Sequence, residues 1–442
     1  MDFLNGNIRS MYFKYLSASF GSALIGCIYT MVDTAVVGQY QGPQGTAALA
    51  VIAPFWNLIY SLGLLLGVGG GVIFSNRRGS GTGDGSENQY FTGSVIAAVV
   101  LAGLAWFGIW NFEVPILTFF GADEGLLPLA REYLGPVKVV FPLFLVNEML
   151  MFFLQNDKNP GRATLAVLSG GIFNIFGDIF FVFGCNLGIF GAGLATAIGA
   201  AISTCVMLSH FFSRKNTLRL VRPAKLFRRL REILVTGFAS FFVDVAMGIL
   251  TVLFNRQIMN YLGANALSVY SPIIQVSTFA QCCAYSVGQA SQPIIATNFG
   301  AGKGGRIRQT LRLALGTVAF FGVFWTALSM ACPKLYIRIF MAPTEEILAM
   351  APAIIRTYAA SFLLLPFNIF STYYFQAIMK PKAAFIVSVA RGLIISGSLI
   401  LILPVVGGGN ALWLTMPITE LIVMFYSASA LRRYTLALPE VQ

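Results

Sequence analysis

Charged residues are scarce in this chain. They make up 10% of its 442 residues, whereas apolar residues make up 57%, and ordinary soluble domains carry roughly a quarter of their residues charged. Histidine occurs once, at position 210, and the six cysteines show no spacing typical of metal ligands. We expect these thiols to be free and buried. The composition excludes a soluble globular domain and indicates a membrane protein.

Two other signals are missing. The first apolar segment is too long for a cleavable signal peptide and lacks a small-residue cleavage site, so we expect none. The glycine-rich run GAGKGG, residues 300–305, is no phosphate-binding loop, because Thr297 replaces its first glycine and a glycine follows Lys303. We therefore expect no transport driven by nucleotide hydrolysis.

Long apolar runs recur along the chain, each near the roughly 20 residues that span a bilayer. The pattern predicts an all-α membrane protein with twelve transmembrane helices. The predicted spans are 11–38, 46–74, 89–112, 127–155, 162–184, 189–212, 231–260, 266–294, 309–332, 349–378, 383–404 and 411–431.

Basic residues are distributed unevenly between the two sides. Most of the 29 Lys and Arg residues lie in the tails and in the loops on the same side as the tails, including the run from Arg214 to Arg231. Positively charged loops stay in the cytoplasm. We predict a multi-pass protein of the bacterial or archaeal plasma membrane with both termini cytoplasmic. The net charge of +12 is thus a sign of topology and does not indicate nucleic-acid binding.

Two pairs of segments indicate an internal duplication. LQNDKNPGRA (154–163) matches FQAIMKPKAA (375–384), and FFGADEGLL (119–127) matches IFMAPTEEIL (339–348). Each pair is about half the chain apart, as expected for a repeat of six helices.

The repeat predicts two six-helix lobes, residues 1–212 and 231–442, related by a pseudo-twofold axis along the membrane normal. Residues 213–230 form a basic cytoplasmic linker between them. Its composition favours an interfacial helix against anionic lipid.

Acidic side chains inside membrane spans indicate ion or proton pathways. With a rise of 1.5 Å per residue, Asp33 lies about 7 Å from the outer end of its span, Asp178 about 9 Å and Thr196 about 10 Å. These three side chains therefore share one level of the membrane. The candidate acids within predicted spans are Asp33, Glu148, Asp178, Asp244 and Glu420.

Asn174 and Asp178 are four residues apart and share one helix face. Together with Asp33 and Thr196 they predict a coupling site in the outer half of the first lobe. Oxygen ligands suit sodium, and two close carboxylates can share a proton. The alternative is four unrelated polar residues, each satisfied by backbone or helix packing.

Other polar residues in the spans have two interpretations each. Asn147 and Glu148 either form a second shell of the coupling site or line water. Lys138 and Arg391 form structural ion pairs or act on substrate. Asp244 either meets a cationic substrate or makes a structural hydrogen bond.

Aromatic residues can line a cavity for flat organic cations through cation–π contacts. The alternative for most of them is packing or lipid contact. With a methionine and a glutamine, the candidates for the cavity are Phe55, Trp56, Tyr60, Met247, Gln275, Phe279, Tyr285, Phe362 and Phe367.

Several segments occur in the order found in the multidrug and toxic compound extrusion (MATE) transporters, which the chain resembles over nearly its whole length. They are MVDTAVVGQY, FGADEGLLPLAREYL, LQNDKNPGRA, FNIFGDIFFVF with GIFGAGLATAIG, and GQASQPIIATNFGAGKGGRIR. The resemblance implies a twelve-helix antiporter that exports amphipathic, often cationic compounds in exchange for sodium or protons. Sodium is the only cofactor it implies.

One branch of that family binds its cation in the N-terminal lobe. Its ligands are an Asp on the first helix, an Asn and an Asp on the fifth, and a Thr on the sixth. Asp33, Asn174, Asp178 and Thr196 match these positions. Another branch uses acids on the seventh and tenth helices. The tenth span here has none and Asp244 is displaced by a turn, so no second cation site is implied.

Two other functions remain open. A flippase for lipids or lipid-linked oligosaccharides of the same superfamily would carry several cationic residues in its cavity. Here only Lys138 and Arg391 lie within spans away from the helix ends. An intramembrane protease would need a complete GxGD motif, which FGD at 176–178 lacks because residue 175 is Ile. We therefore expect a monomeric transporter and no enzyme. The coupling ion and the substrates stay undetermined.

Overall fold

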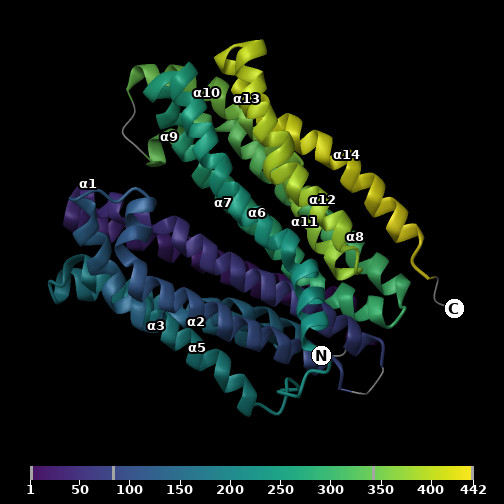
Figure 1. Cartoon of the computed structure of the whole chain (residues 1–442). Helices are drawn as coiled ribbons and strands as arrows, with labels where there is room; N and C mark the ends of the chain where they lie inside the picture. Colours follow the sequence, from purple (N-terminus) through teal and green to yellow (C-terminus); the bar gives the residue numbers. More distant parts are fainter. Residues whose placement is uncertain (1–2, 82–84, 341–343, 440–442) are drawn as a thin grey trace. The chain divides into compact units, whose positions relative to one another are not determined.

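The chain is an assembly of long helices. The computed structural model describes residues 3–81, 85–340 and 344–439, and no strand occurs among them. Figure 1 traces the helices from the purple N-terminal end to the yellow C-terminal end. The all-α prediction is confirmed. Part of the second repeat motif, residues 341–343, lies outside the described residues.

The structure divides into two compact units. Unit 1 is Ser17–Phe241, and unit 2 consists of the described parts of Asp2–Leu16 and Phe242–Gln442. The linker and the first turns of the helix after it thus group with unit 1. Close backbone contacts explain this grouping, because a Cβ atom on Gly237 would lie 2.0 Å from the carbonyl oxygen of Leu65. The lobe boundaries predicted from the sequence fall nearby, at residues 212 and 231.

The first half of the chain forms six α-helices, with short π- and 3₁₀-helical turns after α4 and α5. The first, α1, is broken at Gly42, where a φ of 67° and a ψ of −156° suit glycine alone. Their bounds are α1 Ile8–Gly79, α2 Glu87–Phe119, α3 Leu126–Asn156, α4 Pro160–Ile179, η1 Phe180–Gly184, α5 Gly188–Leu208, η2 Ser209–Phe212 and α6 Leu226–Tyr261.

The second half also consists of α-helices with short π- and 3₁₀-helical turns. Within unit 2, α11 packs against α7, α12 and α14 (Figure 1). Its elements are α7 Gly263–Gly300, α8 Gly304–Ala331, α9 Pro333–Phe340, α10 Glu345–Ala359, η3 Ala360–Leu363, α11 Leu365–Ala377, α12 Pro381–Val389, η4 Ala390–Ile394, α13 Ile395–Gly407, η5 Gly409–Leu414 and α14 Thr415–Leu436.

Eleven helical segments among the described residues are long and apolar enough to cross a membrane. The break at Gly42 divides α1 into two of them, Ile8–Gly42 and Gln44–Gly79. The remaining helix of spanning length is α7, whose 38 residues contain many Ser, Gln and Asn side chains. These segments correspond one by one to the twelve predicted spans.

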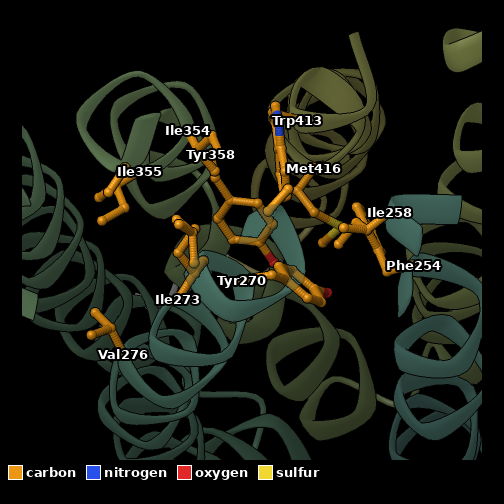
Figure 2. Close-up of a cluster of buried hydrophobic side chains, with 14 of the residues drawn as sticks. Phe254, Ile258, Tyr270, Ile273, Val276, Ile354, Ile355, Tyr358, Trp413 and Met416 are labelled. Carbon is orange, nitrogen blue, oxygen red and sulfur yellow. The ribbon is translucent and has the colours of Figure 1, made fainter. Parts of the chain in front are cut away.

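Aromatic side chains form the centre of a hydrophobic core in unit 2 (Figure 2). The rings of Phe254 and Tyr270 stack with centroids 5.2 Å apart, and Tyr358 meets the ring of Tyr270 edge-on. Trp413 closes the cluster from η5. Phe362 belongs to this core and is only 2% exposed.

The linker runs over unit 1 without forming a helix between residues 213 and 225. Three of its backbone N–H groups bond to side chains of α2. The amide of Arg219 donates to Asn88 at 2.9 Å and that of Val221 to Thr92 at 3.0 Å. An interfacial helix is therefore not formed in residues 213–225, and the last five residues of the predicted linker begin α6. The N–H groups that such a helix would use internally are held by the neighbouring helix.

The cysteines of the described residues form no disulfide bond, as expected, but most of them are not buried. Only Cys283 is buried, and Cys185, Cys205 and Cys332 are exposed at the surface of the protein. Two of these follow helix ends, Cys185 after η1 and Cys332 after α8. The expectation of buried thiols is wrong for these three residues, because two of them lie just beyond helix ends and Cys205 is exposed on α5.

Candidate functional site

Five polar side chains from four helices of unit 1 form a continuous chain of hydrogen bonds. The Tyr133 hydroxyl on α3 donates to Asp33 Oδ2 on α1 at 3.1 Å and lies 3.3 Å from Thr196 Oγ1 on α5. Asn174 Nδ2 on α4 donates to Thr196 Oγ1 at 3.1 Å and to Asp178 Oδ1 at 3.4 Å. The four residues predicted from the sequence are thus brought together, with Tyr133 as a fifth member.

Three buried oxygen atoms of this cluster have no hydrogen-bond partner among the described residues. They are Asp33 Oδ1, Asn174 Oδ1 and Asp178 Oδ2. Asp178 is fully buried and Asn174 is 3% exposed. Buried acceptors left without a partner are unfavourable, so the cluster has the chemistry to receive a proton or a cation that prefers oxygen ligands.

Glycines allow the helices that carry these side chains to approach closely. A Cβ atom on Gly193 of α5 would lie 2.1 Å from the carbonyl oxygen of Tyr133 on α3. One on Gly170 of α4 would lie 2.6 Å from the carbonyl oxygen of Gly199 on α5. Backbone-to-backbone contact at small residues is typical of membrane helices. It places Thr196 between the helices of Tyr133 and Asn174.

The helix backbone changes immediately after Asp178. Residues Phe180–Gly184 form a π-helical turn, and the amide of Cys185 bonds to the carbonyl oxygen of Phe180 at 2.8 Å. Such turns are uncommon and often accompany functional sites. The wider turn lies directly next to the site.

Sequence reasoning missed Tyr133, although one signal would have found it. In the predicted topology the fourth span starts at its outer end, and Tyr133 lies seven residues beyond Leu126, the first residue of α3. This is about 10 Å into the helix. The depth comparison that selected Asp33, Asp178 and Thr196 therefore applies to this hydroxyl as well.

Asn147 and Glu148 lie on the same helix as Tyr133, further toward its C-terminal end. Asn147 donates to the carbonyl oxygen of Ala200 at 3.0 Å and accepts from the Thr204 hydroxyl at 2.8 Å. The nitrogen and the oxygen of the Asn147 amide thus both bond α3 to α5. Glu148 packs its aliphatic part against Gly63 of α1. The second-shell role of the two residues stays a prediction.

The two basic residues within spans form ion pairs inside their own units. Lys138 Nζ lies 3.0 Å from Glu113 Oε2. In unit 2, Arg391 Nε lies 2.7 Å from Glu420 Oε1, and Asn368 Nδ2 donates to Glu420 Oε2 at 2.7 Å. Each of the two basic residues therefore has a carboxylate partner, as the structural interpretation predicts.

The aromatic candidates of unit 1 pack against neighbouring rings. Phe55 stacks on Phe141 with centroids 4.8 Å apart, and Trp56 meets Phe144 at 4.5 Å. Phe55 also borders a small apolar hollow of about 340 Å³ between α1 and α2. The third candidate, Tyr60, has its hydroxyl 3.2 Å from that of Tyr29 on α1.

The candidates of unit 2 differ in exposure. Phe362 is part of the hydrophobic core, and Tyr285 meets Tyr373 with ring centroids 6.3 Å apart. Gln275 is exposed. The partly buried ones are Asp244, Met247, Phe279 and Phe367. Their role in binding substrate stays a prediction.

A second polar cluster lies in unit 1 around Asp157, the first residue after α3 and its span. Asp157 accepts hydrogen bonds from Arg78 Nη1 at 2.8 Å, from His210 Nε2 at 2.8 Å and from the amide and hydroxyl of Thr217. Burial would raise the pKa of Asp157, but these bonds outweigh it and lower the pKa. Asn159 lies against His210 Nδ1 at 3.0 Å. The only histidine thus helps to hold the linker.

The long apolar helices define a membrane protein of many spans, and unit 1 holds a buried acidic cluster. The chain belongs to the MatE family, whose model matches residues 18–180 and 239–399. No cluster of three or more His, Cys, Asp or Glu side chains that would hold a metal occurs among the described residues. The role of the oxygen cluster in unit 1 as a coupling site stays a prediction.

Curated relatives match most of the chain. The multidrug export protein MepA of Staphylococcus haemolyticus is 24% identical over 410 residues, which cover 91% of this chain and 88% of the relative. MepA of Staphylococcus aureus strain NCTC 8325 is 23% identical over 395 residues, which cover 88% and 86%. These relatives are transporters, so the expectation that the chain is no enzyme is confirmed.

Solved structures share the fold at low identity. An outward-facing multidrug resistance MATE family transporter of the MOP superfamily has a TM-score of 0.87 and 19% identity, covering 99% of this chain and 98% of its own. A MOP superfamily transporter from Pyrococcus furiosus has a TM-score of 0.90 and 18% identity, with the same coverage. The prediction of a twelve-helix, two-lobe MATE architecture is confirmed.

Proposed function

We propose that this protein is a secondary active antiporter of the plasma membrane that exports amphipathic, often cationic organic compounds in exchange for protons or sodium. Two relatives that match most of the chain are multidrug export proteins, which supports export of organic compounds. The ion coupling rests on the oxygen cluster of unit 1.

One observation carries the coupling proposal. Two carboxylates on different helices, Asp33 and Asp178, join one hydrogen-bond chain, and each has a buried oxygen atom without a partner among the described residues. Two charged carboxylates in a buried site are unfavourable when no cation neutralises them. A proton or a sodium ion removes that penalty, so the empty and loaded states of the cluster differ in free energy.

The cluster connects four helices, so the binding of a cation or proton to it would change how these helices are arranged during transport. Asp33 is on α1, Tyr133 on α3, Asp178 on α4 and Thr196 on α5. When an external cation is taken up, repulsion between the acids disappears and the four helices are drawn together around it. A shift of this kind changes the affinity for the exported compound only if the two states bind it differently. We propose that the loaded state binds it more weakly, which releases it outside.

Reconstitution of the purified protein in liposomes tests this function. A fluorescent organic cation is loaded, and its movement is followed under an imposed sodium gradient, under a pH gradient, and without either. We expect one of the two gradients to drive transport. Asp33→Asn and Asp178→Asn should each reduce the driven rate at least tenfold, because each removes one charge that the cation neutralises.

Asp123→Asn is the matched control. Asp123 is exposed and caps the first turn of α3 through its Oδ1 atom, which asparagine can replace. This variant should transport like the unmodified protein. Gradient-driven transport that persists in both site variants would exclude the coupling role. Transport of a fluorescent lipid instead of the organic cation would favour a flippase.

A further inference from the structure

A polar cavity lies in unit 2, where the N-terminal segment meets the start of α8. Its volume is about 790 Å³, within the range of small-molecule sites. Three arginines line it, and no acidic residue is among its described lining residues. The arginines are Arg9, Arg306 and Arg312, and the other polar side chains are Asn5, Asn7 and Gln309.

One of the arginines builds the wall of the cavity. Arg306 Nη2 donates to the carbonyl oxygens of Phe3 and Gly6 at 3.0 and 2.6 Å, and its Nε donates to Asn298 at 3.1 Å. Lys303 adds a bond to the carbonyl oxygen of Leu4 at 3.0 Å. The N-terminal segment is therefore held on α7 and α8 before the cavity binds anything.

The other two arginines are available for a ligand. Arg9 and Arg312 are exposed, and neither forms an ion pair or a side-chain hydrogen bond with another described residue. Like charges facing one cavity repel one another in the absence of an anion. A guanidinium is planar and presents paired N–H groups, which suits the oxygens of a phosphate group.

The helix geometry adds to the positive potential. Asn7 accepts a hydrogen bond from the amide of Ser10 at 3.1 Å, so it caps the first turn of α1 at the edge of the cavity. The start of a helix carries partial positive charge and unpaired N–H groups. The cavity thus combines two available guanidinium groups with the positive end of α1, which continues to Asp33.

We propose that this cavity binds a phosphate-bearing anion, with Arg9 and Arg312 as its principal ligands. The chemistry fits both the headgroup of an anionic phospholipid and a free phosphate compound. Basic pockets between spanning helices on the cytoplasmic side are suited to lipid headgroups, and the predicted topology places the cavity on that side. A bound anion links residues 5–9 to α8 and thereby stabilises the start of α1.

Thermal unfolding of the full-length protein separates the two sources of phosphate. In the first arm, inorganic phosphate is titrated against the protein in zwitterionic lipid nanodiscs at constant ionic strength, with chloride as the reference. In the second arm, phosphate is absent and nanodiscs of phosphatidylcholine are compared with nanodiscs that contain phosphatidylglycerol. Ligand at saturation should raise the unfolding midpoint by about 3 °C or more.

The variant Arg9→Gln with Arg312→Gln should lose this shift in whichever arm shows it, and the doubly Lys-substituted variant should keep part of it. Arg432→Gln is the control, because Arg432 is an exposed arginine of the same unit that does not line the cavity.

Gln309→Glu provides an independent test that leaves every arginine in place. Its negative charge should abolish the rise of the unfolding midpoint as well. Absence of a shift in both arms, or an equal shift in all variants, would overturn the proposal.

Discussion

The hydroxyl group of Tyr133 joins the two carboxylates of the proposed coupling site into one hydrogen-bond network. It bonds to Asp33 and lies within reach of Thr196, whose hydroxyl in turn accepts from Asn174. Without it, the carboxylate on α1 and the one on α4 would belong to separate networks. The hydroxyl therefore connects the two halves of the site.

Tyr133→Phe tests this connection. The variant keeps the ring and its packing but removes a hydrogen bond to a charged group, typically about 1.5–3 kcal/mol. We expect gradient-driven transport to fall about tenfold with little change in thermal stability. Tyr261→Phe is the control, because Tyr261 is 47% exposed at the end of α6. Unchanged transport in the Tyr133 variant would separate Tyr133 from the site.

The pair of Arg391 and Glu420 predicts an effect on stability. Both side chains are buried, at 4% and 0% exposure. Arg391→Met leaves the carboxylate of Glu420 without its cation, which typically destabilises a protein by about 3–5 kcal/mol.

The double variant Arg391→Met with Glu420→Gln removes both charges and should recover part of that loss. Thermal unfolding of the two variants in detergent measures the difference. If the single and double variants unfold at the same temperature, the pair contributes no electrostatic stabilisation and this prediction is wrong.

The close contact between α5 and α3 at Gly193 predicts an effect on stability. At Gly193 a Cβ atom would meet the carbonyl oxygen of Tyr133, a backbone atom that cannot move aside. Gly193→Ala should therefore push α5 away from α3 and destabilise the protein by about 1–3 kcal/mol. Because Thr196 is one turn further along α5, gradient-driven transport should fall as well.

Gly161→Ala is the matched control. Gly161 lies in the first turn of α4, and a Cβ atom there would have no neighbour within 4 Å. This variant should be as stable as the unmodified protein or slightly more stable, since alanine favours helix. Thermal unfolding and liposome transport of both variants give the comparison. A stable, active Gly193 variant would show that the two helices can separate freely.

The attachment of the linker depends on pH through Asp157. Because the pKa of Asp157 in the folded protein lies below 3.8, the ordinary value for an aspartate, the charged form contributes stability above about pH 4. That contribution is lost as the pH falls through the lowered folded pKa. Asp157→Asn should therefore be less stable than the unmodified protein at neutral pH, with a difference that narrows below about pH 4.

Unfolding midpoints of both proteins measured from neutral pH to pH 3 check this. Asp123→Asn serves again as control, since its side chain is exposed and lies outside the cluster. A difference that stays constant over the whole range would mean that lost packing, and not the charge of Asp157, causes the destabilisation.

The sidedness of the whole chain can be tested with its own thiols. Cys185 and Cys332 are exposed and follow helices that the basic-residue distribution directs outward. A membrane-impermeant maleimide added to intact cells should label both. A cysteine introduced as Lys215→Cys in the linker should react only after the cells are permeabilised. Labelling in the opposite pattern would reverse the predicted orientation.

Much of the architecture follows from segments considered one at a time. In lipid, each backbone N–H and C=O group must bond within its own segment, so a long apolar run predicts a helix without knowledge of its neighbours. The depth of a residue in the membrane follows from its position along the helix. This is why Asp33, Asn174, Asp178 and Thr196 could be grouped from the sequence.

Contacts between helices could not be predicted in this way. The partners of Lys138 and Arg391 depend on how each helix is rotated about its axis and where it crosses the next. The role of Tyr133 depends on the close approach of α5 at Gly193. The path of the linker is decided by side chains of α2, far away in the sequence.

Hydropathy and charge therefore determine which segments cross the membrane, and they predict in which direction and at what depth the acids lie. They do so because transfer of each segment into lipid is a property of that segment alone. Only the tertiary structure decides which oxygen atoms meet, which charges are paired and which arginines stay available around a cavity. These depend on side chains from separate helices coming within hydrogen-bond distance, and packing alone sets that distance.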